Sequence, residues 1–277
     1  MSIRCVFLDV DGTTVDSEPR NRRAIEEAAR VGGHKIKEKD WDFLGGQGDN
    51  VIWSLISQLM PDFKEVFNTA ASFERACLNT KLDRIHEIKK IEEVFEAISL
   101  FRRNGIKIAP VSNSITPDAL ASLEHAGYSR EDFVFCLFRD DLVKKNLRAK
   151  PYPDPYREAL RMMNASLRQA ADESGEDFTD ITPAECLVFE DSKTGVRSGL
   201  AAGMNVLHIA AENEPRLDEE ELEQLKACHG GRYVSTPRPG VVDISNRIIQ
   251  NGMPDDGHAQ CHISTKLRTP TAPGPTL

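Results

Sequence analysis

The chain lacks a hydrophobic run long enough to cross a bilayer, and its amino terminus lacks a basic segment followed by an apolar stretch of signal-peptide length. It also lacks an excess of positive charge, because 35 Lys and Arg stand against 44 Asp and Glu, for a net charge of −9. An acidic protein repels phosphate backbones and anionic lipids, which disfavours nucleic-acid and membrane-surface binding. We therefore expect a cytoplasmic, monomeric protein that binds neither.

Paired cysteines are missing as well. The six cysteines are scattered, no two form a CxxC motif, and several lie inside apolar runs such as Cys5–Leu8. This pattern indicates reduced thiols packed as small hydrophobic groups and argues against a zinc or disulfide framework. What the chain does contain, 40% hydrophobic and 29% charged residues over 277 positions, is typical of a globular protein with one large domain or two modest ones.

Apolar runs of strand length alternate with helical patterns along most of the chain. The runs expected to form buried strands are Ile3–Leu8, Ile106–Val111, Phe133–Phe138, Cys186–Phe189 and Val206–Ile209. Gly105 and Gly127 end two of the helices between them. Strands that alternate with helices predict an α/β fold, with a Rossmann-like parallel sheet between two helical layers.

One stretch, residues 16–88, interrupts this alternation because it contains no convincing strand pattern. The helices expected there are Glu18–Val31, Asp49–Met60 and Asp62–Leu82, and the second carries an apolar stripe of Val51, Ile52, Leu55, Ile56 and Leu59. A helical module inserted directly after the first strand would lie over the end of that strand as a cap. We expect residues 1–15 and 89–250 to form the α/β catalytic core and residues 16–88 to form the cap.

Two polar stretches complete the predicted organisation. Residues 166–180 are polar and acidic, which predicts a surface loop with some helix that lengthens one crossover. Residues 251–277 are rich in Pro, Gly and Thr, which predicts a disordered tail without a catalytic role.

Two carboxylates follow directly on the first predicted strand, in the sequence Asp9-Val10-Asp11-Gly12-Thr13. Ligands of a parallel sheet bind beyond the carboxyl ends of its strands, so both acids point toward the expected site. Such a pair is costly unless it binds a cation or shares a proton. The spacing suits Asp9 as a nucleophile and Asp11 as a proton donor and acceptor. A strand-end turn with solvated acids remains the alternative, because so short a motif also occurs by chance.

Three further segments place polar residues at related positions. Ser112 and Asn113 follow the strand that ends at Val111, where a hydroxyl and backbone N–H groups form a phosphate cradle. Lys150 opens the proline-stiffened segment KPYPDPY, and Glu190-Asp191 ends another buried run. Each alone has a simpler interpretation: a helix-entry serine, a solvated lysine, and a helix N-cap.

Taken in order, DVDGTTVDSE, VSNS, KPYPDPY and FEDSKTGVRSGLAAGM resemble the haloacid dehalogenase superfamily over roughly residues 3–210. The set is most similar to the phosphoglycolate-phosphatase-like and β-phosphoglucomutase-like branch, which has a helical cap. The resemblance implies a phosphoric monoester hydrolase that acts on a small phosphorylated molecule, a sugar phosphate or a phosphoglycolate-like compound.

The resemblance also implies a role for each motif position. Asp9 would form an aspartyl-phosphate, and Asp11 would protonate the leaving oxygen and then activate water. Ser112, Asn113 and Lys150 would stabilise charge on the phosphoryl oxygens.

The implied cofactor is Mg²⁺. It would be held by the Asp9 carboxylate, the Asp11 backbone carbonyl and Asp191, while Glu190 would bind the metal or orient its waters.

Two departures bear on the function. The sugar-phosphate mutases of this branch usually carry a His where this chain has Asn21, and an Arg near the stretch 45–49, where this chain has none. Both departures favour a phosphatase, with a β-phosphoglucomutase-like mutase as the alternative. A non-catalytic binding protein is a weaker alternative, because all four motifs are intact. The cap sequence does not identify the substrate.

Overall fold

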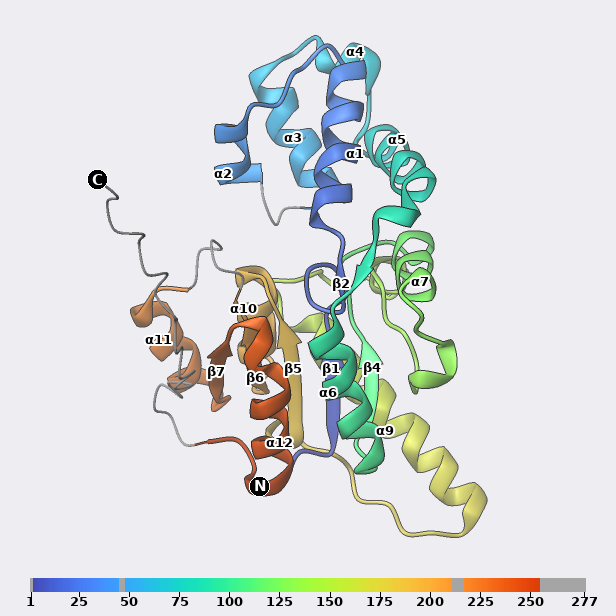
Figure 1. Ribbon diagram of the computed structural model, residues 1–277, viewed down its shortest axis with the longest axis vertical. Coiled ribbons are helices and arrows are strands. Elements are labelled where there is room, and N and C mark those ends of the chain that lie inside the picture. Colours follow the sequence, from blue (N-terminus) through green and yellow to red (C-terminus); the bar gives the residue numbers. More distant parts are fainter. Residues whose placement is uncertain (1, 45–47, 211–216, 255–277) are drawn as a thin grey trace, which may run out of the picture.

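The computed structural model describes residues 2–44, 48–210 and 217–254. Its main element is a five-stranded sheet in the order β4-β1-β5-β6-β7, in which all neighbours are parallel (Figure 1). The strands are β1 (Cys5–Leu8), β4 (Lys107–Pro110), β5 (Cys186–Glu190), β6 (Asn205–Ile209) and β7 (Tyr233–Thr236). The predicted α/β class with a Rossmann-like parallel sheet is therefore confirmed.

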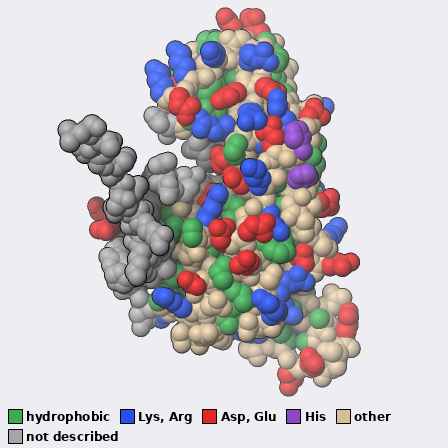
Figure 2. Space-filling view, viewed as in Figure 1, with side chains coloured by type: hydrophobic (Ala, Val, Ile, Leu, Met, Phe, Trp, Pro, Cys, Tyr) green, Lys and Arg blue, Asp and Glu red, His purple; other side chains and the backbone are tan. Residues whose placement is uncertain are grey.

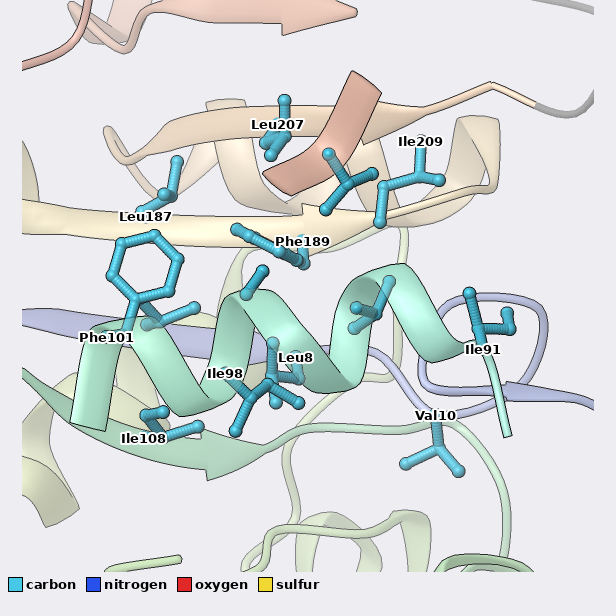
Figure 3. Packing of buried hydrophobic residues seen from close by; sticks show 14 of the residues in the cluster. Leu8, Val10, Ile91, Ile98, Phe101, Ile108, Leu187, Phe189, Leu207 and Ile209 are labelled. Carbon is cyan, nitrogen blue, oxygen red and sulfur yellow. The ribbon is translucent and has the colours of Figure 1, made fainter. Parts of the chain in front are cut away.

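Helices bury both faces of this sheet, which explains why its central strands read as continuous apolar runs. One face packs against α6 (Glu92–Arg103), α7 (Thr116–His125) and α12 (Val241–Asn251). The other packs against α9 (Asp154–Ser174), α10 (Lys193–Ala201) and α11 (Glu219–His229), with α8 (Arg139–Lys144) nearby. Within β1, Val6 and Leu8 face the first layer while Cys5 and Phe7 face the second. Figure 3 shows the first layer, where Ile98 and Phe101 of α6 point at the sheet.

A group of helices lies beyond the carboxyl end of the sheet as an inserted cap (Figure 1), and it forms the upper part of the molecule in the space-filling view (Figure 2). The helices are α1 (Glu18–Val31), α2 (Trp41–Leu44), α3 (Asp49–Leu59), α4 (Phe63–Val66) and α5 (Ala70–Asp83). A short antiparallel ribbon of β2 (Val15–Asp16) and β3 (Lys89–Lys90) joins this insertion to the core. The two chain crossings therefore leave and re-enter the core side by side.

The cap has its own apolar core, and only part of the apolar stripe predicted for α3 belongs to it. Ile52 and Ile56 are almost fully buried and Leu55 packs against them, but Val51 is 40% and Leu59 65% exposed. The predicted five-residue stripe is thus wrong at its edges. The buried face of α3 is narrower than the predicted stripe, because the helix packs against the rest of the cap on one side only.

The helix predicted over Asp62–Leu82 is two helices, α4 and α5, with a break between them. Phe67 leaves the helical path so that its ring can pack against Phe63 and Phe73, and its carbonyl accepts a hydrogen bond from Trp53 Nε1 at 2.9 Å. Thr69 then caps α5, since its hydroxyl accepts from the Ser72 N–H at 3.2 Å. An aromatic cluster and a cap residue override a continuous apolar pattern.

The strand predicted over Phe133–Phe138 does not form. Val134 and Leu137 donate backbone hydrogen bonds to Ile108 and Pro110 of the edge strand β4, at 2.9 and 3.0 Å, and Leu137 forms an isolated bridge to Val111. A regular ladder requires partners two residues apart on the added strand. Here the spacing is three, so the segment lies against the edge of the sheet without extending it.

The loop predicted over 166–180 is largely helical, because α9 continues to Ser174 and ends at the left-handed Gly175 (φ 72°). The acidic composition masks a helical repeat, in which Met163 and Leu167 pack into the second core layer and Ala171 is buried. Residues 175–182 form the remaining loop.

The carboxyl-terminal part adds elements that the sequence patterns did not predict, namely β7, α11 and α12. The predicted tail over 251–277 begins inside the fold, since Asn251 ends α12 and Met253 is buried against the first helical layer. From residue 255 onward it lies outside the described residues, as do residues 45–47. None of the helices in the described part of the chain combines the length and apolar character needed to cross a bilayer.

Candidate active site

The polar residues that follow three neighbouring strands meet at one edge of the sheet. Asp9 follows β1, Ser112 follows β4, and Asp191 follows β5, so the strand order brings them together. A cavity of about 160 Å³ opens there between the core and the cap, and these three residues line it with Asp11 and Lys150. This position beyond the carboxyl ends of parallel strands is where α/β sheets bind ligands.

Asp9 is buried and its carboxylate contacts an ammonium group. Lys150 Nζ lies 2.6 Å from Asp9 Oδ1, and it also donates to the Val111 carbonyl at 2.7 Å. Burial, which Lys150 offsets only in part, raises the pKa of Asp9 to about 8. Burial alone would lower the pKa of Lys150, but the carboxylates of Asp9 and Glu190 outweigh it and raise that pKa, so the ammonium stays charged.

Glu190 is fully buried and accepts hydrogen bonds from three side chains. Lys150 Nζ and Tyr156 Oη both lie 2.6 Å from Glu190 Oε1, and Ser192 Oγ lies 3.1 Å from Oε2. Gly195 makes room for this carboxylate, because a Cβ there would lie 1.8 Å from the Glu190 side chain. Lys150 is therefore held by Glu190 as well as by Asp9.

Asp191 is placed by contacts to the turn after β1. Its Oδ1 accepts a hydrogen bond from Thr13 Oγ1 at 3.1 Å, and its backbone carbonyl lies 2.9 Å from His208 Nε2. Gly12 has a left-handed conformation (φ 80°), and a Cβ there would lie 1.8 Å from Asp191 Oδ2. The glycine of the DVDG motif is thus required both by its backbone angle and by the close approach of this carboxylate.

Asp11 is held as a carboxylate by three donors. The hydroxyls of Ser17 and Ser114 donate to its two oxygens at 2.6 Å each, and Asn21 Nδ2 donates at 3.2 Å. Burial alone would raise the pKa of Asp11, but the two hydroxyls, helped by Lys81 and Arg20, lower it below its usual value. Asn21, which stands where the mutases have His, therefore contacts the second acid directly.

The two polar residues after β4 differ in what their side chains do. The Ser112 hydroxyl is buried and accepts from the Ser114 N–H at 3.0 Å. Asn113 holds the backbone of Lys150 from both sides: Oδ1 accepts from the Lys150 N–H at 3.0 Å, and Nδ2 donates to its carbonyl at 3.2 Å. The Asn113 side chain is thus engaged in positioning Lys150, which leaves its predicted phosphate contact to the backbone.

The donor set fits a hard divalent cation. Asp9, Glu190 and Asp191 each offer a carboxylate oxygen, and these oxygens lie within 4.8 Å of one another. Clustered carboxylates are the ligands that Mg²⁺ prefers, and they are costly to bury together without a cation. Glu190 accepts three hydrogen bonds from side chains, and these occupy much of its capacity to bind a metal directly.

Several residues of the site were missed or given no role by the motif analysis. Ser114 and Tyr156 lie inside the quoted segments VSNS and KPYPDPY, yet only the fold shows that they contact Asp11 and Glu190. Ser17 and Thr13 belong to the first motif, where their spacing from the two acids was the available signal.

Replacing Lys150 with methionine is expected to lower kcat by roughly 10²–10³-fold, since a donor aimed at the reacting group is lost. It should also lower the free energy of unfolding by about 3–5 kcal/mol, because the fully buried Glu190 carboxylate would lose its counter-ion. Phosphate release and urea unfolding measure the two effects. Lys144→Met, which removes a lysine 74% exposed at its side chain, is the control, and equal stability of both variants would contradict the prediction.

The comparison with known proteins agrees with this geometry. A model of the haloacid dehalogenase-like hydrolases matches residues 3–203. The chain belongs to this family. It is 33% identical over 229 residues to hexitol phosphatase A of Escherichia coli (strain K12), covering 79% of this chain and 90% of that protein. It is 23% identical to the phosphorylated carbohydrates phosphatase of Thermotoga maritima, over 74% of this chain and 84% of that one.

The fold of this chain matches a solved structure of a CbbY variant from Rhodobacter sphaeroides in complex with xylulose-(1,5)bisphosphate, with a TM-score of 0.63. The match is 20% identical and covers 87% of this chain and 96% of that chain, so it establishes the fold alone. The predicted family, the fold with its helical cap, and the enzyme class of phosphoric monoester hydrolases are confirmed.

Proposed function

We propose that this hydrolase removes the phosphate of a small sugar or sugar-alcohol monophosphate through an aspartyl-phosphate on Asp9, with Mg²⁺ as cofactor. The observation that carries the proposal is the convergence of Asp9, Lys150 and Asp191 at the strand ends, with Asp11 in the same cavity. The names of the curated relatives, hexitol phosphatase A and phosphorylated carbohydrates phosphatase, support the substrate class.

The first step would be attack of an Asp9 oxygen on phosphorus, which forms the acyl-phosphate bond while the ester O–P bond breaks. Lys150 would stabilise charge on the phosphoryl oxygens and on Asp9. Its ammonium is held by Glu190, and its backbone is held by hydrogen bonds to the Asn113 side chain. The Ser112 hydroxyl and the N–H groups of the following turn lie at the end of β4, where they can receive a phosphoryl oxygen.

Asp11 would supply the proton to the leaving alkoxide and then take one from the attacking water. Its contacts from Ser17, Ser114 and Asn21 hold the carboxylate in place and leave one acceptor position, on Oδ2, for the leaving oxygen or the water. The bound phosphate, a dianion beside it, would favour protonation of Asp11 at the moment when a general acid is needed.

Mg²⁺, held by Asp9 and Asp191 with the Asp11 carbonyl, would neutralise negative charge on the phosphate and on the carboxylates around it. Glu190 would contribute by orienting the metal's waters, since its carboxylate already accepts hydrogen bonds from Lys150, Tyr156 and Ser192.

The mutase alternative is tested by product analysis. A mutase must keep the dephosphorylated sugar until it is phosphorylated again, and the position where mutases place a His holds Asn21, bonded to Asp11. We expect free phosphate, without any need for a bisphosphate activator. The enzyme is incubated with β-glucose 1-phosphate and a trace of glucose 1,6-bisphosphate. Glucose 6-phosphate formed many-fold faster than phosphate from any substrate tried would establish the mutase.

A further inference from the structure

The cap-side half of the cavity contains cations that are already neutralised. Lys81 of α5 lies 2.9 Å from Asp49 at the start of α3, and 3.6 Å from Asp118 of α7. Arg139 at the start of α8 lies 2.7 Å from Glu74 of α5, an ion pair that joins core and cap. These pairs line the same cavity as the catalytic acids.

The other charged residues of this half of the cavity are paired or acidic as well. Among the described lining residues outside the phosphoryl site, the cations are Arg22, Lys81 and Arg139, and the carboxylates are Glu18, Asp49, Glu74 and Asp118. Arg22 is itself paired with Glu38 at 2.8 Å and stacks on the Trp41 ring at 4.6 Å. A second anionic group entering here would meet carboxylates and would have to compete for every cation.

An apolar wall lies beside these ion pairs. It is formed by side chains of the cap helices that also line the cavity, namely Ile25, Trp41, Leu44 and Ile52. Such a surface matches the C–H face of a carbon chain, while paired acids and cations match its hydroxyl face.

We propose that this half of the cavity recognises an uncharged, polyhydroxylated body and rejects a second anion, with Asp49 and Lys81 as the specificity-determining pair. The inference rests on the proposed phosphatase function and narrows it to hexitol-like monophosphates, against phosphoglycolate and sugar bisphosphates. A hydroxyl can donate to Asp49 and accept from Lys81 while the two remain paired, so neither charge loses its partner. A phosphate or carboxylate can use only Lys81, and it is repelled by Asp49 and Asp118.

A comparison of kcat/KM for four phosphate esters provides the first test. The magnesium-loaded enzyme is assayed with sorbitol 6-phosphate, fructose 1,6-bisphosphate, 2-phosphoglycolate and p-nitrophenyl phosphate. We expect kcat/KM for sorbitol 6-phosphate to exceed that for the bisphosphate and for phosphoglycolate by about 100-fold or more. Failure to hydrolyse any of the four would overturn the proposed function itself. Hydrolysis that favours fructose 1,6-bisphosphate or 2-phosphoglycolate would leave the phosphatase standing and overturn this inference.

Charge-neutral variants provide the second test. Glu74→Gln releases Arg139, and we expect it to raise the ratio of kcat/KM for fructose 1,6-bisphosphate to that for sorbitol 6-phosphate about tenfold or more. Asp49→Asn should lower kcat/KM for sorbitol 6-phosphate about 10–100-fold, and by less for p-nitrophenyl phosphate, which has no hydroxyls to bind. Ratios measured on one preparation cancel differences in the folded fraction.

The matched control is Glu221→Gln, which removes a carboxylate from an ion pair with Arg197 (2.8 Å) away from the cavity. Its substrate ratios should equal those of the unmodified enzyme. If the two cavity variants also keep the unmodified ratios, the ion pairs do not set specificity and the proposal is wrong.

Discussion

Replacing Asp9 with asparagine is expected to lower kcat by roughly 10⁴-fold or more, because the amide cannot attack phosphorus in place of a carboxylate oxygen. The substitution nearly preserves shape, and Lys150 keeps its contacts to Glu190 and to the Val111 carbonyl. The loss should therefore appear in turnover rather than in folding. Initial rates of phosphate release, with circular dichroism as a check on folding, measure it.

Asp11→Asn separates the roles of the two acids. It leaves the nucleophile in place and removes proton transfer, an effect typically worth about 10²–10⁴-fold. A labile acyl-phosphate should be trapped on residue 9 and on no other acid. Asp180→Asn, at an exposed acid paired with Arg168, is the matched control and should keep full activity. An acyl-phosphate found on Asp11 of the unmodified enzyme, or an active Asp9→Asn variant, would show that the roles are reversed.

The central strands could be predicted from sequence because helices cover both of their faces. Cys5–Leu8 and Cys186–Glu190 are buried at every position, so composition alone marked them. Phe133–Phe138 has the same composition, but its place at the sheet edge depends on hydrogen-bond spacing, which composition does not encode. The loop predicted over residues 166–174 is wrong for the opposite reason. The many charged residues on the exposed face of α9 made its helical pattern hard to recognise.

The position of the site was predictable, while its contacts were not. Parallel strands end at one edge, so Asp9, Ser112 and Asp191 could be expected at that edge, and the strand order β4-β1-β5 makes them neighbours. That Tyr156 supports Glu190, and that Asn113 holds the Lys150 backbone, depends on loop paths far apart in sequence. Residues 45–49 likewise contain no Arg, and the cations that line the cap side of the cavity come from the cap helices α1 and α5 and from α8 of the core.

The charges beneath the cavity are the reason why we expect substrate binding to need a divalent cation. Asp9, Glu190 and Asp191 bring three carboxylates together against one ammonium, that of Lys150. A phosphate monoester adds up to two more negative charges at the same place. Lys150 already donates to Asp9, Glu190 and a backbone carbonyl, so it cannot neutralise this charge by itself.

Exhaustive chelation with EDTA is therefore expected to abolish turnover, and added Mg²⁺ should restore it. Charge stabilisation by a bound cation is worth several kcal/mol, which corresponds to a loss on the order of 10³–10⁴-fold. The chelated protein should remain folded, because Thr13, Ser192 and Tyr156 still bind the carboxylates of Asp191 and Glu190. Calorimetric titration of Mg²⁺ into the chelated protein provides a readout besides activity, and Asp191→Asn should weaken that binding. Full activity without metal would mean that these carboxylates serve another purpose.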